Sequence, residues 1–208
     1  MPPPLELTLI LAATRDMGIG LNGTLPWTGL RREMAYFARV TKRIPTSLPP
    51  TSLNAVIMGR KTWDSIPPRF RPLKGRLNVV ISRSVTGPPA YPGDVNAEPV
   101  MASSLEQALA FLREQKQRQK VGRVFVIGGA QIYGAALGSK ETRRVLLTRV
   151  LSDFECDAFF PLELKEGVEG WKRVGQEEFG GWVGEEVEGG VQEEAGTRYE
   201  FEMWERGD

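Results

Sequence analysis

The sequence places one carboxylate, Glu33, at a position where packing of the fold does not explain a charged side chain. It lies in a helix-like segment, Leu30–Phe37, just after a glycine-rich loop. Wound at about 100° per residue, the helix separates apolar residues from cations. One face holds Leu30, Met34, Phe37 and Thr41, and the other holds Arg31, Arg32, Arg39 and Lys42. Glu33 falls among the apolar residues, where a carboxylate is costly unless it is paired. This position predicts a negative charge held ready for a cationic or amidine-like ligand.

A plainer interpretation treats Glu33 as an acidic residue favoured by the dipole at the start of a helix. The dipole explains an acidic residue in the first turns. It does not explain a place on the apolar face, so we favour the ligand-binding interpretation.

Three expected strand ends carry residues that suit phosphate: Gly59-Arg60-Lys61-Thr62, Ser82-Arg83-Ser84 and Gly128-Gly129-Ala130. Ligands of open α/β sheets bind beyond the carboxyl ends of the strands. The first and third segments open helices, whose free N–H groups favour anions. If the strands are neighbours, Arg60, Lys61 and Arg83 cluster, and three cations for one terminal phosphate favour NADPH over NADH.

Each of these features also has a structural alternative. A single cation can be a solvated surface charge, and Gly128-Gly129 can simply make a tight turn between a strand and a helix. The GxGxxG fingerprint is absent, so the usual dinucleotide-binding fold is not supported. The loop Gly18–Trp27, with three glycines, is either an ordinary surface turn or a lid over a site.

The composition excludes several kinds of catalytic chemistry and of binding partner. The chain has 208 residues, a net charge of +1, one cysteine and no histidine. Without histidine, Ser-His and Cys-His catalytic pairs are excluded, and acid–base work falls to carboxylates, Tyr, Lys or water. The charge balance predicts no nucleic-acid partner, and the lone Cys156 suits a reducing compartment. The apolar run Leu5–Ala13 contains Glu6 and is too short to span a membrane.

The order of the expected elements predicts an α/β fold in a single domain, residues 1–208. Leu5–Ala13, Asn54–Met58, Leu77–Ile81 and Arg123–Ile127 have the apolar character of strands buried on both faces. Between them we expect the Glu33 helix, with Thr28 as its N-cap, a helix after Gly59, a helix with a capping box at Ser103–Glu106, and a helix over Ala130–Leu137. Arg43–Thr51, with three prolines, is expected to form a surface loop.

From Arg143 onward the expected elements are strands alone. Val145–Val150, Trp171–Glu178 and Arg198–Glu205 have strand character, and the Gly- and Glu-rich stretch Gly180–Gly196 is expected to be an extended, exposed hairpin loop. The predicted architecture is a central, mainly parallel twisted sheet with an antiparallel C-terminal hairpin and helices on both faces.

Several motifs, in order, resemble the dihydrofolate reductase family over roughly residues 5–205. They are Met17-Gly18-Ile19-Gly20, Leu25-Pro26-Trp27, Leu30-Arg31-x-Glu33, Val56–Trp63, Arg71–Arg76 and Ile127–Tyr133. The proline-bearing insert after Thr41 and the long C-terminal hairpin resemble the eukaryotic form, fungal members included. The resemblance implies that NADPH reduces dihydrofolate, with hydride moving to C6 and a proton to N5.

The resemblance also implies roles for individual residues. Glu33 would pair with the pteridine 2-amino group and N3, supported by Thr148, while Trp27 would fix an ordered water; these three are the expected catalytic residues. The ring and tail of the substrate would contact Ile10, Glu33, Met34, Phe37, Ser65, Ile66, Leu73, Arg76, Ile127 and Tyr133, with Arg76 on the α-carboxylate of the glutamate tail. NADPH would contact Ala12, Gly18, Ile19, Gly20, Gly23, Thr24, Gly59, Arg60, Lys61, Thr62, Ser82, Arg83, Ser84, Ile127, Gly128, Gly129, Ala130, Gln131, Ile132 and Tyr133.

No metal site is expected. We expect a monomer, since no apolar stripe is left over for a partner. The expected location is the cytoplasm. Two other functions remain open at this point. One is the pyrimidine reductase of riboflavin synthesis, which would need a phosphate-binding group at Arg76 and has less use for Glu33. The other is a silent folate- or nucleotide-binding module, which would not turn over.

Overall fold

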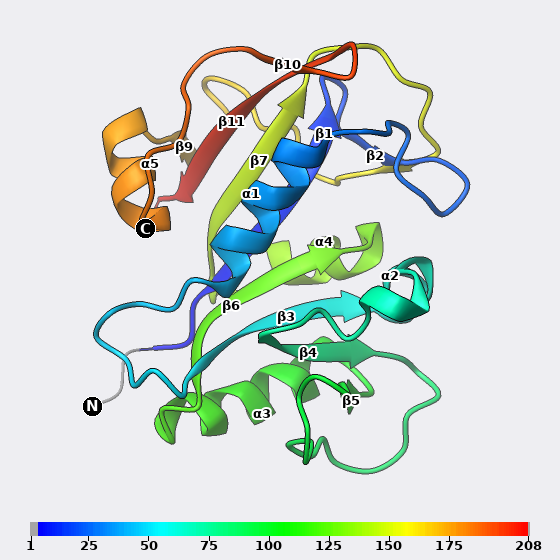
Figure 1. Ribbon diagram of the computed structural model, residues 1–208, viewed down its shortest axis with the longest axis vertical. Coiled ribbons are helices and arrows are strands. Elements are labelled where there is room, and N and C mark those ends of the chain that lie inside the picture. The colour runs from blue at the N-terminus through cyan, green and yellow to red at the C-terminus, as the bar shows by residue number, and fades with distance from the viewer. Residues whose placement is uncertain (1–3, 208) are drawn as a thin grey trace.

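A nine-stranded twisted sheet organises residues 4–207, the part of the chain that this computed structural model describes (Figure 1). Residues 1–3 and 208 of the expected domain lie outside the described residues. The strand order is β10-β11-β7-β1-β6-β3-β4-β5, with β9 pairing β11. The strands are β1 (Leu7–Thr14), β3 (Leu53–Gly59), β4 (Arg76–Ile81), β5 (Val100–Ala102), β6 (Val121–Gly128), β7 (Thr142–Val150), β9 (Trp171–Arg173), β10 (Gln192–Glu194) and β11 (Thr197–Arg206).

Strands β7, β1, β6, β3, β4 and β5 run parallel, whereas β11 is antiparallel to β7, β9 and β10. The predicted fold class, a mainly parallel sheet ending in an antiparallel hairpin, is therefore confirmed. A small second sheet pairs β2 (Gly18–Gly20) with β8 (Ala158–Phe159).

Helices cover both faces of the large sheet because its strands are apolar on both sides. Along β1, Leu7, Leu9 and Leu11 enter a core shared with α3 (Leu105–Gln117) and α4 (Ala130–Leu137), while Ile10 enters the opposite core with α1 (Arg31–Lys42) and α5 (Gln176–Val183). This alternation follows from the two-residue period of a strand. The remaining helices are α2 (Arg60–Ser65) and the 3₁₀ turn η1 (Pro68–Phe70).

Strands β1 and β6 separate toward their carboxyl ends. They pair only over Leu7–Leu9 and Val124–Val126, although β1 continues to Thr14 and β6 to Gly128. In Figure 1 the two arrowheads point in different directions. The sheet is thereby divided into two halves that are joined at one end, and the candidate site lies where they separate.

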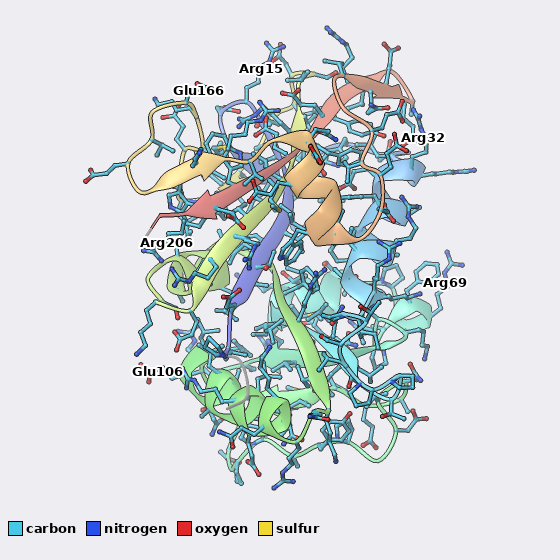
Figure 2. The ribbon with its side chains drawn as sticks, turned by 90° about the vertical axis from the view of Figure 1, so that its left-hand side faces the viewer. Arg15, Arg32, Arg69, Glu106, Glu166 and Arg206 are labelled. Atoms are coloured by element: carbon cyan, nitrogen blue, oxygen red, sulfur yellow. The ribbon has the colours of Figure 1, made fainter. Side chains whose placement is uncertain are left out.

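The surface carries charges of both signs. Figure 2 shows Arg15, Arg32 and Arg69 on separate parts of the surface, together with Glu106 and Glu166. Within residues 4–207 no helix combines the length and the apolar character that crossing a bilayer requires.

The C-terminal region corrects two predictions. Of Trp171–Glu178, only Trp171–Arg173 is a strand, and α5 begins at Gln176 and continues to Val183, into the stretch predicted to be a loop from Gly180. Phe179 and Val183, one turn apart, are buried against the sheet. The Gly180-Gly181 pair obscured this helical spacing, although Glu177 and Glu178 in the first turn favour a helix start.

Two predicted helix caps are also wrong. Thr28 does not cap α1, because the helix begins at Arg31 after Leu30 and no side chain of Leu30 or Thr28 bonds to it. The capping box of α3 lies one residue later than expected. Ser104 accepts from the Gln107 backbone N–H, and the Gln107 side chain accepts from the Ser103 N–H in return.

The predicted apolar face of α1 is partly wrong. Leu30 and Thr41 are buried as expected, but the centre of the buried face is Tyr36 and Val40, and Met34 is 61% exposed. The helix is rotated so that Met34 and Phe37 flank the sheet rather than cover it. This rotation leaves Glu33 at the edge of the packed face.

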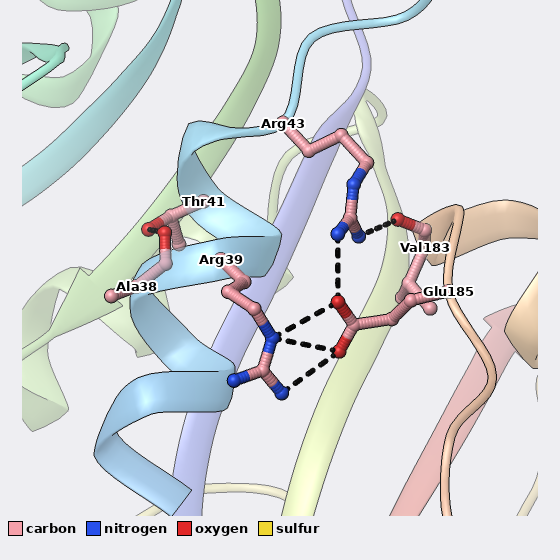
Figure 3. Close-up of polar contacts among 6 residues, drawn as sticks. All are labelled: Ala38, Arg39, Thr41, Arg43, Val183 and Glu185. Carbon is pink, nitrogen blue, oxygen red and sulfur yellow. Dashed lines mark hydrogen bonds and ion pairs between the residues drawn. The ribbon is translucent and has the colours of Figure 1, made fainter.

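Glu185 fastens the segment after α5 to the end of α1 (Figure 3). Its carboxylate accepts hydrogen bonds from Arg39, at 3.1 Å, and from Arg43, at 2.8 Å. Arg43 also donates to the Val183 carbonyl at 2.9 Å. Burial of Glu185 opposes ionisation, yet the two arginines lower the pKa of its carboxyl below the usual value. Residues far apart in sequence are thus joined beside the helix that carries Glu33.

We predict that Glu185→Gln destabilises the fold by about 1–2 kcal/mol, because two guanidinium groups lose a mostly buried anion. Urea unfolding measures the change. Glu186→Gln, at the exposed neighbouring position, is the matched control and should change the free energy of unfolding by less than about 0.5 kcal/mol. Equal stabilities for the two variants would contradict the role given to this contact.

Candidate active site

Glu33 lies in the first turn of α1 and faces β7. The Thr148 hydroxyl, on β7, donates to Glu33 Oε1 at 2.9 Å. Thr148 is buried, and Ala12 of β1 lies opposite it in the sheet register. The expected contact between Glu33 and Thr148 is present. It brings a carboxylate from one face of the sheet to the carboxyl ends of two neighbouring strands.

The environment of Glu33 raises the pKa of its carboxyl from 4.5 to about 7. Loss of water contact is the main cause, the hydrogen bond from Thr148 opposes the rise, and the charge of Glu194 adds to it. At neutral pH the group is therefore close to half ionised. A ligand that donates two N–H groups to it would shift that balance toward the carboxylate.

Trp27 fixes the chain where it enters α1. Its side chain is 4% exposed and packs in a small core with Leu30, Val150 and Tyr199. Phe154 meets the indole edge-on, with ring centroids 5.7 Å apart. A bulky ring wedged at this point holds the start of the helix, and hence Glu33, against the sheet.

Tyr133 joins α4 to the open side of β1. Its buried hydroxyl donates to the Ile10 carbonyl at 2.9 Å, just beyond the last residue of β1 that pairs with β6. The bond satisfies a strand carbonyl left free where the two strands separate.

The residues expected along the substrate ring come from α1, from β6 and from the segment that runs from the end of α2 to β4. Phe37, Ile66, Leu73 and Ile127 are half-buried and pack against the same core as α1 and α5. Met34 is exposed next to them, and Ser65 is exposed with its hydroxyl bonded to the Thr62 carbonyl. Ser65 is thus engaged within α2, whereas the four half-buried side chains pack against one buried cluster.

Arg76 is a buried cation, 5% exposed. Its guanidinium donates to the Thr41 hydroxyl at 3.0 Å and to the Lys74 carbonyl at 3.0 Å. Burial lowers the pKa of Arg76 to about 10, so the group stays charged at neutral pH. Among residues 4–207 no carboxylate forms an ion pair with it. A buried cation held only by neutral acceptors fits a carboxylate supplied by a ligand.

The three strand ends expected to bind phosphates are neighbours. Gly59 pairs with Ile81, and Met58 pairs with Gly128, so the ends of β4, β3 and β6 lie side by side. Arg60, Lys61, Arg83 and Ser84 are exposed there, and neither α2 nor α4 has a side-chain cap at its start. Ser82 differs from the rest, because it is buried and its hydroxyl bonds to that of Ser84 at 2.9 Å.

Gly128 allows close approach at this edge. Its φ of 129° is open to glycine and strained for other residues, and an added Cβ would lie 3.5 Å from both the Thr62 hydroxyl and Tyr133. Gly129 likewise faces Thr62, and Gln131 and Ile132 follow in the first turn of α4. The backbone after β6 therefore carries no side chain at Gly128 and Gly129, and the Thr62 hydroxyl lies next to it.

The glycine-rich loop is anchored at its base. Gly18 and Gly20 pair with β8, and Asp157 accepts from the Asn22 N–H at 3.0 Å. A Cβ on Gly18 would overlap the sulfur of Cys156. Ile19 is half-buried, whereas Gly23 and Thr24 are exposed at the loop tip.

The sequence did not predict the residues that position Glu33 and Arg76 or act on their charges. Glu194 acts on Glu33 from β10, and its only sequence signal is a carboxylate in a Glu-rich stretch. Asn78 fixes the turn before Arg76 by bonding Leu73 through both its amide atoms. The partner of Arg76, Thr41, was expected on the apolar face of α1, with no signal for its contact.

Comparison with known proteins decides the family. A family model described as dihydrofolate reductase matches residues 6–181. The chain belongs to the dihydrofolate reductase family. It is 44% identical to the dihydrofolate reductase of Pneumocystis carinii over 206 residues, covering 97% of each chain. The Cryptococcus neoformans enzyme is 43% identical over 222 residues, covering 96% of this chain and 94% of the relative. The Mus musculus enzyme is 40% identical over 202 residues, covering 97% and 98%.

A solved structure, Schistosoma mansoni dihydrofolate reductase, matches with a TM-score of 0.76 and 30% identity, covering 99% of this chain and 100% of the other. The dihydrofolate reductase family implies a nicotinamide cofactor. The adjacent strand ends fit such a group, because they combine exposed cations, uncapped helix starts and the bare backbone of Gly128.

We predict that the Glu33 carboxyl makes stability depend on pH. An unfolded chain releases this proton near pH 4.5, but the folded chain holds it to about pH 7. The group therefore stabilises the fold below about pH 4.5 and loses that contribution as the pH rises from there through about 7. Glu33→Gln, which cannot ionise, should match the parent near about pH 4 and exceed its stability by up to about 3 kcal/mol at about pH 8.

Chemical denaturation across this pH range measures the difference. Glu166→Gln removes an exposed carboxylate and should leave the pH dependence unchanged. A Glu33→Gln variant no more stable than the parent at the high-pH end would show that Glu33 is not desolvated.

Proposed function

We propose that this chain reduces 7,8-dihydrofolate to 5,6,7,8-tetrahydrofolate with NADPH, by hydride transfer to C6 and protonation at N5, and so supplies one-carbon metabolism. The observation that carries the proposal is the desolvated Glu33 carboxyl, bonded to Thr148, at the carboxyl ends of β1 and β7. Family membership favours this activity over the pyrimidine reductase and over a silent binding module.

Glu33 would bind the pterin through the 2-amino group and N3–H. A carboxylate accepts two parallel N–H bonds, and Thr148 already occupies one lone pair of Oε1 and so orients the group. Because the pKa of Glu33 is about 7 without ligand, pairing with two N–H donors favours the ionised form. Binding and ionisation are then coupled.

The apolar side chains Phe37, Ile66, Leu73 and Ile127 would hold the flat ring, with Met34 at the outer edge. Arg76 would bind the α-carboxylate of the glutamate tail, which supplies the anion that its buried guanidinium lacks. Orientation matters more than a nucleophile in hydride transfer, where the reacting carbons need to lie roughly 3–3.5 Å apart.

NADPH supplies the hydride when bound. Arg60, Lys61, Thr62 and Arg83, at the ends of β3 and β4, would bind the adenine-side phosphates, and the backbone from Gly128 would lie along the pyrophosphate and ribose. Ala12 and Ile19 would offer backbone groups to the carboxamide. The loop of Gly18–Trp27 would exclude bulk water from the reacting rings.

The proton for N5 would come from water. A carboxylate that holds the 2-amino edge of the pterin cannot also reach N5, so Glu33 would act by polarising the ring. Trp27 would fix an ordered water nearby. We also propose that the chain works as a single-domain monomer in the cytoplasm, a reducing compartment that suits the lone Cys156.

We predict that Glu33→Gln lowers kcat/KM for dihydrofolate by about 10²–10³-fold at neutral pH, because glutamine offers one acceptor and opposes the second N–H with its own amide. Oxidation of NADPH, followed by its near-ultraviolet absorbance, measures the rate. The variant should still bind NADPH like the parent. Unchanged activity at neutral pH would end the proposed role of Glu33, and a parent without turnover would favour the silent binding module.

We predict that Arg83→Ala weakens NADPH by about 10–100-fold and NADH by less than about 3-fold, because Arg83 would pair with the extra phosphate. Fluorescence titration with each cofactor measures the two affinities. Arg118→Ala, an exposed arginine at the end of α3, is the matched control. Equal losses for both cofactors would refute this assignment.

A further inference from the structure

Helix α1 begins without a capping side chain of its own, and a carboxylate from another strand takes that place. Both oxygens of Glu194, on β10, accept from the Arg32 backbone N–H, at 3.0 and 3.1 Å. In Figure 1, β10 lies at the end of the sheet where α1 begins. An anion at the start of a helix satisfies a free N–H and is favoured by the dipole.

Further contacts fix Glu194 in place. Its partner across the hairpin is Thr197 of β11, and the Tyr199 hydroxyl donates to Glu194 at 3.4 Å. The Arg32 guanidinium, labelled in Figure 2, donates to the Glu193 carbonyl at 2.6 Å and lies 3.8 Å from the Glu194 carboxylate. The hairpin of β10 and β11 therefore binds the helix at Arg32, one residue before Glu33.

We propose that Glu194 is a positioning residue for the candidate active site, which sets both the place of Glu33 and the charge that faces its carboxyl group. The proposal rests on the proposed function of Glu33. Glu194 touches no ligand in this scheme, and it acts through the first turn of α1.

Among the groups around Glu33, Glu194 is the one whose charge acts on the Glu33 carboxyl. From β7 the neighbour is Thr148, which is neutral. Tyr36 of α1, Tyr133 of α4 and Tyr199 of β11 all have a pKa raised by burial and further by Glu33 itself, so they stay neutral too. Arg32 is already paired with Glu194. After burial, which is the larger effect, the charge of Glu194 is what raises the pKa of Glu33.

The two effects of Glu194 are linked. Glu194, bonded to the Arg32 N–H in the first turn of α1, presents its negative charge to Glu33. Burial and, to a smaller extent, that charge delay the ionisation of Glu33 until the pH approaches neutrality or a ligand supplies N–H donors. The hairpin thus adjusts the pH at which Glu33 ionises and can accept the N–H donors of a ligand.

The test is a titration of the ligand-free protein with ¹³C-labelled glutamate side chains, in which Glu33→Gln identifies the Glu33 signal. Glu194→Gln keeps an oxygen for the Arg32 N–H but removes the charge. Its Glu33 midpoint should fall by about half a pH unit, the effect of one partly screened charge. Glu193→Gln, the exposed neighbour, should leave the midpoint unchanged. Glu194→Ala should lower the midpoint as well and also lower the melting temperature, because the cap is lost.

An unchanged Glu33 midpoint in Glu194→Gln would overturn the proposal. If that variant does not fold, the parent protein gives the test: screening by salt should lower the Glu33 midpoint, and a midpoint independent of salt would be the overturning result. The proposed function fails separately, through absent turnover of dihydrofolate by the parent, while this titration needs no substrate. With turnover present, the pH profile of kcat/KM should move toward acid in Glu194→Gln.

Discussion

Removal of one carboxyl group from water is the constraint around which the site is built. Glu33 could have been solvated had α1 started a turn later or been rotated toward its cationic face. Instead the helix is fixed at both ends, by Trp27 and Glu194 near its start and by Glu185 near its end. Burial alone would leave the carboxyl protonated, and the hydrogen bond from Thr148 restores part of its acidity. The result is a group close to its midpoint at neutral pH, which can respond to a ligand at small free-energy cost.

The C-terminal third of the chain does more than complete the sheet. Helix α5 covers the same face as α1, Glu185 follows it, and β10 returns to the first turn of α1. Each contact joins residues more than 140 positions apart in sequence. The face of the sheet that carries Glu33 is consequently assembled from the two ends of the chain, and folding has to bring them together before the site exists.

Much of this architecture was predictable from the sequence because the signals are local. Continuous apolar runs identified β3, β4 and β6, and Glu33 stood out because its type disagreed with its face. The phosphate-binding strand ends needed only strand order to become neighbours. Contacts between distant side chains carry no such local signal. Nothing near Glu194 marks it as the cap of α1, and Thr28 resembles a better cap by sequence alone. Helix α5 was missed because its two glycines have low helix propensity, while burial of Phe179 and Val183 supplies the stabilising energy.

The separation of β1 from β6 has a mechanical consequence. The halves of the sheet share backbone bonds only near Leu7–Leu9, so their relative angle is softest at the opposite end. One half contributes Glu33 and Thr148, and the other contributes the cations after β3 and β4. A molecule that touches both halves has to fix that angle as it binds. Once one ligand has done so, a second meets halves that are already aligned, and the two can favour each other without direct contact.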